Sequence, residues 1–243
     1  MTTPEPVTVT PPRAVRRTVL EQRWSDVVFV HWAVDPAAVA PLLPAGVRPD
    51  VYGEETYVGL IAFRNTSTAL FGGPSVPYLG HFPEVNVRLY SVGPDGRRGV
   101  VFRSLDASRL ATVTGARAIG VPYAWSRIRM GRRGDRWAAV SRRRWPGPSG
   151  AGSRLVVEIG EAVEPNPLEL FVTARWGLHV RLRGLGTAYW PNQHRPWQLH
   201  RAEVGELAED LVAAAGLPAP GRAPDSVLFS PGVTTRFGPP EPV

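Results

Sequence analysis

Glycine and proline interrupt this chain so often that few long helices fit between them. The sequence contains 25 glycines and 26 prolines, and both residue types favour turns and end helices. The runs between them are short and rich in β-branched and aromatic residues, as at 27–32, which is typical of buried strands. With 43% hydrophobic residues, a chain of this length can enclose one sizeable core or two small ones. We predict one mostly β domain.

Turn residues and hydrophobic runs together predict the order of the elements. Besides 27–32, strands are expected at 56–63, 86–92, 100–105, 124–130, 136–141, 154–158, 177–183 and 197–204. Short helices are expected at 37–43, 107–118, 166–173 and 206–215, the second with Asp106 as its N-cap. These elements form one domain at 21–217, with a flexible arm at 1–20 and a proline-rich tail at 218–243.

All 28 basic side chains are arginine, and the chain contains neither lysine nor cysteine. A lysine imine needs a lysine amine, and disulfides, thiol nucleophiles and sulfur-ligated metal sites need cysteine. These classes of function are excluded. The five histidines lie far apart with no metal-ligand spacing, so neither a metal nor a cofactor is expected.

The formal net charge of +7 raises the question of a nucleic-acid partner. The arginines are scattered, with local runs only at 132–133 and 142–144, and turn residues around them indicate a solvated hairpin rather than a phosphate-binding face. We expect no nucleic-acid partner. The N-terminus lacks the pattern of a signal sequence, and no window approaches the roughly 18 apolar residues of a membrane span. A cytoplasmic location without membrane contact is therefore expected.

The segment 81–90 alternates polar and apolar side chains. As a strand it places Glu84, Asn86, Arg88 and Tyr90 on one face and only apolar residues on the other. The apolar face must meet a core. The polar face either meets water or lines a cavity in which an acid, an amide, a guanidinium and a phenol act together, and periodicity leaves both alternatives open.

Several motifs in a fixed order resemble the YqjF-like family of uncharacterised bacterial proteins, a branch of the acetoacetate decarboxylase-like superfamily. The resemblance covers about residues 20–205. The motifs are Trp24–Asp26, His31–Trp32, Leu42–Val47, Gly59–Phe63, Phe82–Tyr90, Gly99–Asp106 and Val121–Tyr123.

This resemblance implies an α+β fold in which a mostly antiparallel sheet closes into a cone or barrel around a small-molecule cavity, with a few short helices. In the decarboxylases a lysine at a helix end forms an imine and a glutamate assists. Glu84 matches the glutamate position, and Arg117 stands where the lysine would be. A guanidinium stays protonated and cannot form an imine, so the decarboxylase reaction is not carried over.

Two functions remain compatible with these residues. The first is a lyase, hydratase or cyclase, in secondary metabolism, that acts on a carbonyl-bearing substrate by acid/base catalysis and oxyanion stabilisation. The second is a non-catalytic small-molecule-binding protein that retains the cavity. The candidate catalytic residues are Glu84, Arg117 and Tyr90, and the candidate substrate-binding residues are Arg88, Asn86, His81 and Tyr123. A small molecule is the expected partner, and a homo-oligomer is left open.

Three structural expectations follow from this assignment. An arginine should lie against Glu84 and keep it ionised, because an opposite charge lowers a carboxylate pKa. Arg117 should bind an oxyanion or carbonyl oxygen, so that its loss weakens ligand binding by ~1.5–3 kcal/mol. The segment 65–83 is too long for a hairpin turn and should lie at the cavity mouth. The alternative is that Glu84, Arg88 and Arg117 form a purely structural ion-pair network.

Overall fold

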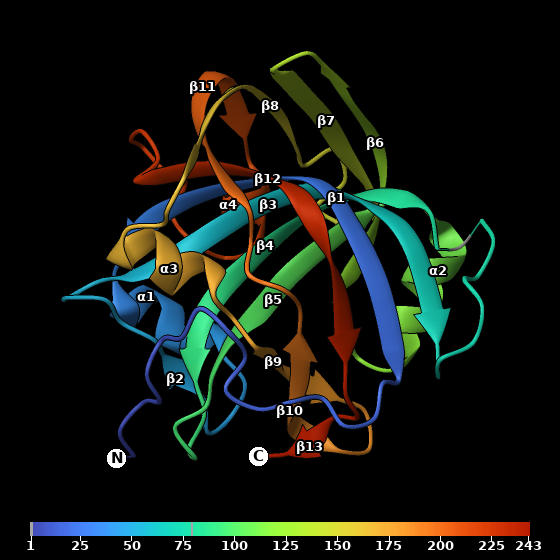
Figure 1. The fold of residues 1–243 in the computed structure, drawn as a ribbon, viewed down its shortest axis with the longest axis vertical. Helices are drawn as coiled ribbons and strands as arrows, with labels where there is room; N and C mark the ends of the chain where they lie inside the picture. Colours follow the sequence, from blue (N-terminus) through green and yellow to red (C-terminus); the bar gives the residue numbers. More distant parts are fainter. Residues whose placement is uncertain (1, 79) are drawn as a thin grey trace.

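The strands of this protein hydrogen-bond into one continuous sheet that closes on itself (Figure 1). A computed structural model describes residues 2–78 and 80–243 of the chain. Within these residues, thirteen strands form the sheet. They are β1 Leu20–Val34, β2 Arg48–Pro49, β3 Thr56–Leu70, β4 Phe82–Val92, β5 Arg98–Ala107, β6 Tyr123–Arg133, β7 Arg136–Trp145, β8 Gly152–Val163, β9 Gly177–Leu182, β10 Gly186–Gln193, β11 Leu199–Glu209, β12 Ser226–Phe237 and β13 Glu241–Pro242.

The helices are short, as the spacing of glycine and proline predicts. They are α1 Pro36–Val39, continued by a 3₁₀ turn at Ala40–Leu42, α2 Leu110–Ala118, α3 Pro167–Thr173 and α4 Leu211–Ala214. Asp35 caps α1 and Asn166 caps α3, each followed by a proline in the first turn. No helix in the described part of the chain is long and apolar enough to cross a membrane.

The pairings close two circuits of strands that share β12, β1, β3, β4 and β5. One circuit continues from β5 through β6, β7, β8 and β11 back to β12. The other continues from β5 through β9 and β10 to β12. In Figure 1 the first lies above the shared strands and the second below them, near both termini. Most pairings are antiparallel; in the described residues β5 pairs in parallel with β6 and β9.

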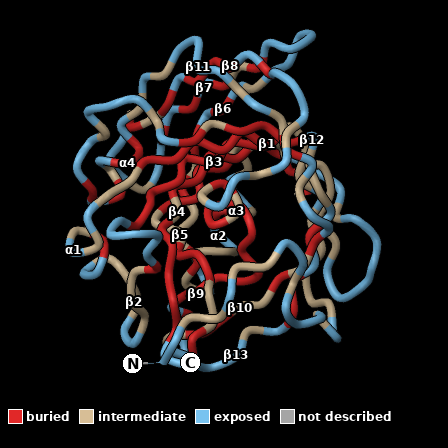
Figure 2. The backbone as a smooth tube through the Cα atoms, turned by 60° about the vertical axis from the view of Figure 1, so that its left-hand side comes forward, coloured by how far each residue is buried: buried red, intermediate tan, exposed pale blue. Residues whose placement is uncertain are grey.

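The shared strands separate an apolar core from a cavity. Val28, Leu60 and Val87 project from one face of β1, β3 and β4 into the main hydrophobic cluster, together with Trp137 and Leu155 of the upper circuit. The opposite face carries the residues that line the cavity. Because both faces are covered, the backbone of these strands is buried along much of its length (Figure 2), which explains their nearly continuous apolar runs.

Two predicted helical features are wrong because tertiary contacts overrode local preference. The first half of 206–215 continues strand β11, paired with β8, and only Leu211–Ala214 is helical. Asp106 does not cap α2, which begins at Leu110. Its side chain is buried in β5 and binds Arg143.

The two flanking segments are also more structured than predicted. Within the predicted tail, β12 pairs with β1 from Ser226 to Phe237 and is central to the sheet, because its apolar residues pack on the core. The predicted arm has no helix or strand in residues 2–18. It nevertheless lies against the body, where the Glu5 amide donates to the Gly96 carbonyl at 2.9 Å.

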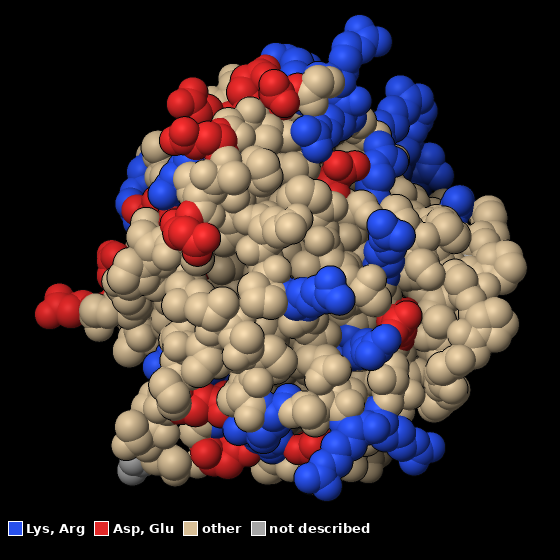
Figure 3. Space-filling view, in the orientation of Figure 1, with Lys and Arg blue, Asp and Glu red and all other residues tan. Residues whose placement is uncertain are grey.

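The two arginine runs lie at the β6–β7 hairpin. Figure 3 shows arginine side chains gathered over this part of the molecule, at the upper right. Arg142 and Arg144 are exposed, whereas Arg143 between them is buried, since alternate residues of a strand point to opposite faces.

Candidate functional site

A cavity of about 560 Å³ lies on the polar face of β4. Its walls come from the strands of the lower circuit and from α2, and aromatic and aliphatic side chains predominate. Among the lining residues are Leu20, Trp24, Phe29, Phe63, Phe102, Trp190, Trp197 and Phe237, with Glu84, Asn86 and Arg88 from β4. The polar face of 81–90 therefore lines a cavity rather than meeting water.

Segment 65–83 borders the cavity, as predicted. Thr68, Leu70, Phe71 and Val76 belong to the lining, and Phe71 is 72% exposed. The first part of the segment continues strand β3 to Leu70 rather than forming a loop.

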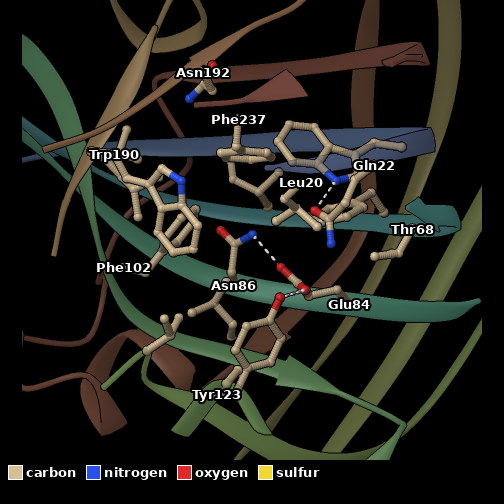
Figure 4. Close-up of a pocket in the computed structure, with 18 of the residues that line it drawn as sticks. Leu20, Gln22, Thr68, Glu84, Asn86, Phe102, Tyr123, Trp190, Asn192 and Phe237 are labelled. Carbon is tan, nitrogen blue, oxygen red and sulfur yellow. Dashed lines mark hydrogen bonds between the residues drawn. The ribbon is translucent and has the colours of Figure 1, made fainter. Parts of the chain in front are cut away.

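Glu84, Asn86 and Tyr123 form a hydrogen-bonded cluster in the cavity wall (Figure 4). Asn86 Nδ2 donates to Glu84 Oε1 at 3.2 Å, and the Tyr123 hydroxyl donates to Glu84 Oε2 at 3.0 Å. Glu84 and Asn86 are each 3% exposed. Figure 4 shows Trp190 and Phe237 across the cavity from this cluster.

Burial decides the protonation of this cluster. It raises the pKa of Glu84 from 4.5 to about 7, against the opposing effect of the hydrogen bonds from Asn86 and Tyr123, and the negative charge of Asp106 raises it further. Burial and the neighbouring Glu84 also raise the pKa of Tyr123 well above 10. At neutral pH Glu84 therefore populates both its acid and its base form, while Tyr123 keeps its proton.

The expected arginine partner of Glu84 is not present. In the described part of the chain no ion pair joins an arginine to Glu84, and the prediction of an ionised, arginine-paired carboxylate is wrong. Asp106, the charged neighbour that acts on Glu84, is itself paired with Arg143, through Nη2–Oδ2 and Nε–Oδ1 distances of 2.6 and 2.9 Å. Ser126 also donates to Asp106, at 2.5 Å.

Arg117 and His81 do not line the cavity. The face of α2 toward it carries Thr112, Gly115, Ala116 and Ile119, which share one side of a helix by their spacing. Arg117 points elsewhere, donates from Nη1 to the Tyr123 carbonyl at 2.8 Å and lies over the Trp145 ring at 5.1 Å. His81 is exposed on the surface.

Tyr90 lies behind the cavity wall instead of beside Glu84. Its hydroxyl donates to the Val172 carbonyl at 2.9 Å and lies 2.7 Å from Nε2 of His31. It also accepts a hydrogen bond from Nε of Arg88. Of the seven candidate residues, the cavity wall thus brings together Glu84, Asn86, Tyr123 and Arg88.

Several lining residues were missed by the sequence analysis. Trp190 and Asn192 come from β10, His194 directly follows it, and Arg175 lies between α3 and β9. The glycines at 184 and 186, both with positive φ, form the turn between β9 and β10. This pair of glycines after a predicted strand could have indicated the hairpin.

Comparison with known proteins identifies the family of this chain and proteins that share its fold. A family described as an uncharacterized conserved protein, DUF2071, matches residues 21–234. The chain belongs to this family. The uncharacterized protein YqjF of Bacillus subtilis (strain 168) is 28% identical over 222 residues, which cover 88% of this chain and 91% of that protein.

Solved structures with the same fold include an acetoacetate decarboxylase-like enzyme and an enduracididine biosynthesis enzyme. One from Sphingomonas wittichii RW1 has a TM-score of 0.62 and 13% sequence identity, covering 96% of both chains. The enduracididine biosynthesis enzyme MppR has a TM-score of 0.61 and 14% identity, covering 95% of this chain and 90% of its own. At this identity the likeness shows the fold, which is the one that the sequence motifs implied.

Proposed function

We propose that this protein is an enzyme that transfers a proton on a carbonyl-bearing small molecule, with Glu84 as the acid and base. The observation that carries the proposal is the buried Glu84 in a cavity wall with a pKa of about 7. A general acid/base is most effective when its pKa lies near the working pH. The acetoacetate decarboxylase-like enzymes with the same fold support an enzymatic role.

The neighbours of Glu84 suit the charge that such a reaction develops. When the carboxylate removes a proton from the carbon beside a carbonyl, negative charge moves to the carbonyl oxygen. The Tyr123 hydroxyl and the Asn86 amide, both neutral donors at the same carboxylate, can turn to that oxygen. Glu84 then returns its proton to carbon or to a departing hydroxyl, which gives isomerisation, elimination or ring closure without an imine.

Solvent exchange of ketone protons tests this proposal. The probe is 2-octanone in D₂O, and ¹H NMR measures how fast the protons beside its carbonyl are lost. We expect the protein to accelerate exchange over buffer and Glu84→Gln to lower the rate at least ~100-fold, because general acid/base catalysis contributes roughly 10²–10⁴-fold. Glu203→Gln is the matched control, since Glu203 is exposed on β11. Equal rates for the protein and Glu84→Gln would contradict a catalytic Glu84.

The variant Arg117→Ala tests whether Arg117 lies outside the site, as in the structure, or belongs to it, as the motifs implied. Because Arg117 holds the Tyr123 carbonyl from outside the cavity, we expect the variant to lose about 1 kcal/mol of stability in urea unfolding. The exchange rate of 2-octanone should stay within about twofold of the parent. A tenfold lower exchange rate in the folded variant would show that Arg117 does contribute to the site.

The second candidate function is ligand binding without catalysis. The predominantly apolar lining favours it, since such a cavity holds a ligand by burial alone. It predicts saturable binding of 2-octanone in titration calorimetry together with an exchange rate equal to that of buffer.

A further inference from the structure

Arg88 shares the cavity face of β4 with Glu84, but its guanidinium is directed away from Glu84. Nε donates to the Tyr90 hydroxyl at 3.1 Å and Nη2 to the Val172 carbonyl at 2.8 Å. Four residues along a strand separate Glu84 and Arg88 by roughly 13 Å between Cα atoms. Arg88 therefore lies at the other end of the polar face, too far away to hold the oxygen that reacts at Glu84.

Positive charge exceeds negative charge around Arg88. Arg175 also contacts Tyr90: its guanidinium lies over the Tyr90 ring at 4.9 Å, and the residue is 4% exposed. Asp50 is shared by Arg98 and Arg175. Among the residues that the structure describes, Arg88 has no carboxylate partner, and the buried Nη2 of Arg175 has no hydrogen-bond partner. Arg98 and Arg175 thus share one carboxylate, and Arg88 pairs with none in the described residues.

The titratable side chains around these arginines add no compensating negative charge. Burial, together with the charge of Arg88, lowers the pKa of His31 well below 6.5 and that of His194 to about 4. Burial raises the pKa of Tyr90, although both arginines oppose this effect. All three groups are neutral at pH 7. Arg88 is partly buried in the cavity wall, and an anionic ligand group there would give its guanidinium the charged partner that it lacks.

We propose that Arg88 binds the carboxylate of an elongated oxo acid whose carbonyl group lies at Glu84. This inference rests on the proposed function and names its substrate class. Asn86 separates the two polar ends on β4, and its register partners Ile61 and Leu105 on the neighbouring strands line the cavity with apolar side chains, which suits a carbon chain between the two groups. A cavity of about 560 Å³ is in the range that takes a ligand of drug-like size rather than a three-carbon acid.

A series of ligands that differ only in these groups tests the inference. Titration calorimetry at pH 7 compares 7-oxooctanoate, in which the chain separates the two groups, with 2-octanone, which lacks the carboxylate, and with pyruvate. We expect 7-oxooctanoate to bind at least tenfold more tightly than either. Equal affinity for 7-oxooctanoate and 2-octanone would overturn the inference, since it would show that the guanidinium contributes nothing.

Variants assign the preference to Arg88. Arg88→Met should abolish the preference for 7-oxooctanoate over 2-octanone, and Arg88→Lys should retain part of it because it keeps the charge but not the planar fork. Arg127→Met is the matched control, because Arg127 is exposed on β6. A preference that survives in folded Arg88→Met would place the carboxylate elsewhere and overturn the inference; if that variant does not fold, Arg88→Lys and the ligand series decide.

The two proposals fail separately. Arg88-dependent binding of 7-oxooctanoate without proton exchange would support the anion site and contradict the enzymatic proposal. Glu84-dependent exchange of 2-octanone, with no advantage for 7-oxooctanoate, would support the enzyme and contradict the anion site.

Discussion

Replacing Arg143 by methionine is expected to lower the free energy of unfolding by about 3–5 kcal/mol, because it leaves the Asp106 carboxylate buried without its counter-charge. The side chains of Arg143 and Asp106 are 5% and 0% exposed, and two hydrogen bonds join them. Urea unfolding at pH 7 measures the loss.

An exposed ion pair whose arginine lies on β7, the strand of Arg143, gives the control. Arg136 and Glu158 are 3.0 Å apart with side chains 62% and 50% exposed, so Arg136→Met should cost about 0–1 kcal/mol. The double variant Asp106→Asn with Arg143→Met should recover part of the loss, because it removes the orphaned charge. If Arg143→Met and Arg136→Met were equally mild, the buried pair would not be a main contributor to stability.

Between pH 4 and pH 8 the free energy of unfolding of the parent is expected to fall by about 3 kcal/mol more than that of Glu84→Gln. The pKa of Glu84 is about 7 in the folded protein and 4.5 as its ordinary value. Between these values the folded state holds a proton that the unfolded state has released, so stability falls as pH rises. The contribution is complete below pH 4.5 and is lost as pH passes 7. A shift of about 2.5 units corresponds to about 3 kcal/mol.

Unfolding free energies of the parent and Glu84→Gln across this pH range measure the difference. Only the difference between the two proteins is informative, because His179 and His194, both with a pKa lowered to about 4 by burial, act in the opposite direction. Their contribution to the free energy of unfolding is lost as pH falls below 6.5, and this loss is the same in the parent and the variant. Glu203→Gln should follow the parent. Parallel curves for parent and Glu84→Gln would mean that Glu84 is not held in a desolvated state.

Local sequence patterns account for much of the fold and part of the site. The alternation at 81–90 assigned Glu84, Asn86 and Arg88 to one face, and the structure confirms that all three line the same cavity. The strands expected at 86–92 and 100–105 are confirmed as β4 and β5, which pair antiparallel. The lack of lysine excludes a lysine imine whatever the fold.

What lies opposite a strand or helix face was decided only by the tertiary structure. Periodicity states which side chains share a face, as Glu84 and Asn86 do, but the partner of Glu84 from another strand is set by how β4 and β6 approach one another. That partner proved to be Tyr123 rather than an arginine. The rotation of α2 about its axis directs Ala116 toward the cavity and Arg117 away from it.

The composition of a segment likewise did not determine its place in the sheet. The proline-rich C-terminal region contains β12, because eleven aligned positions with β1 outweigh the local preference of its residues. The same composition describes a solvated tail and a central strand, since backbone pairing depends on the strand that is available beside it and not on the segment alone. Sequence thus determined which residues act together on one element, and the closure of the sheet determined which elements face one another across the cavity.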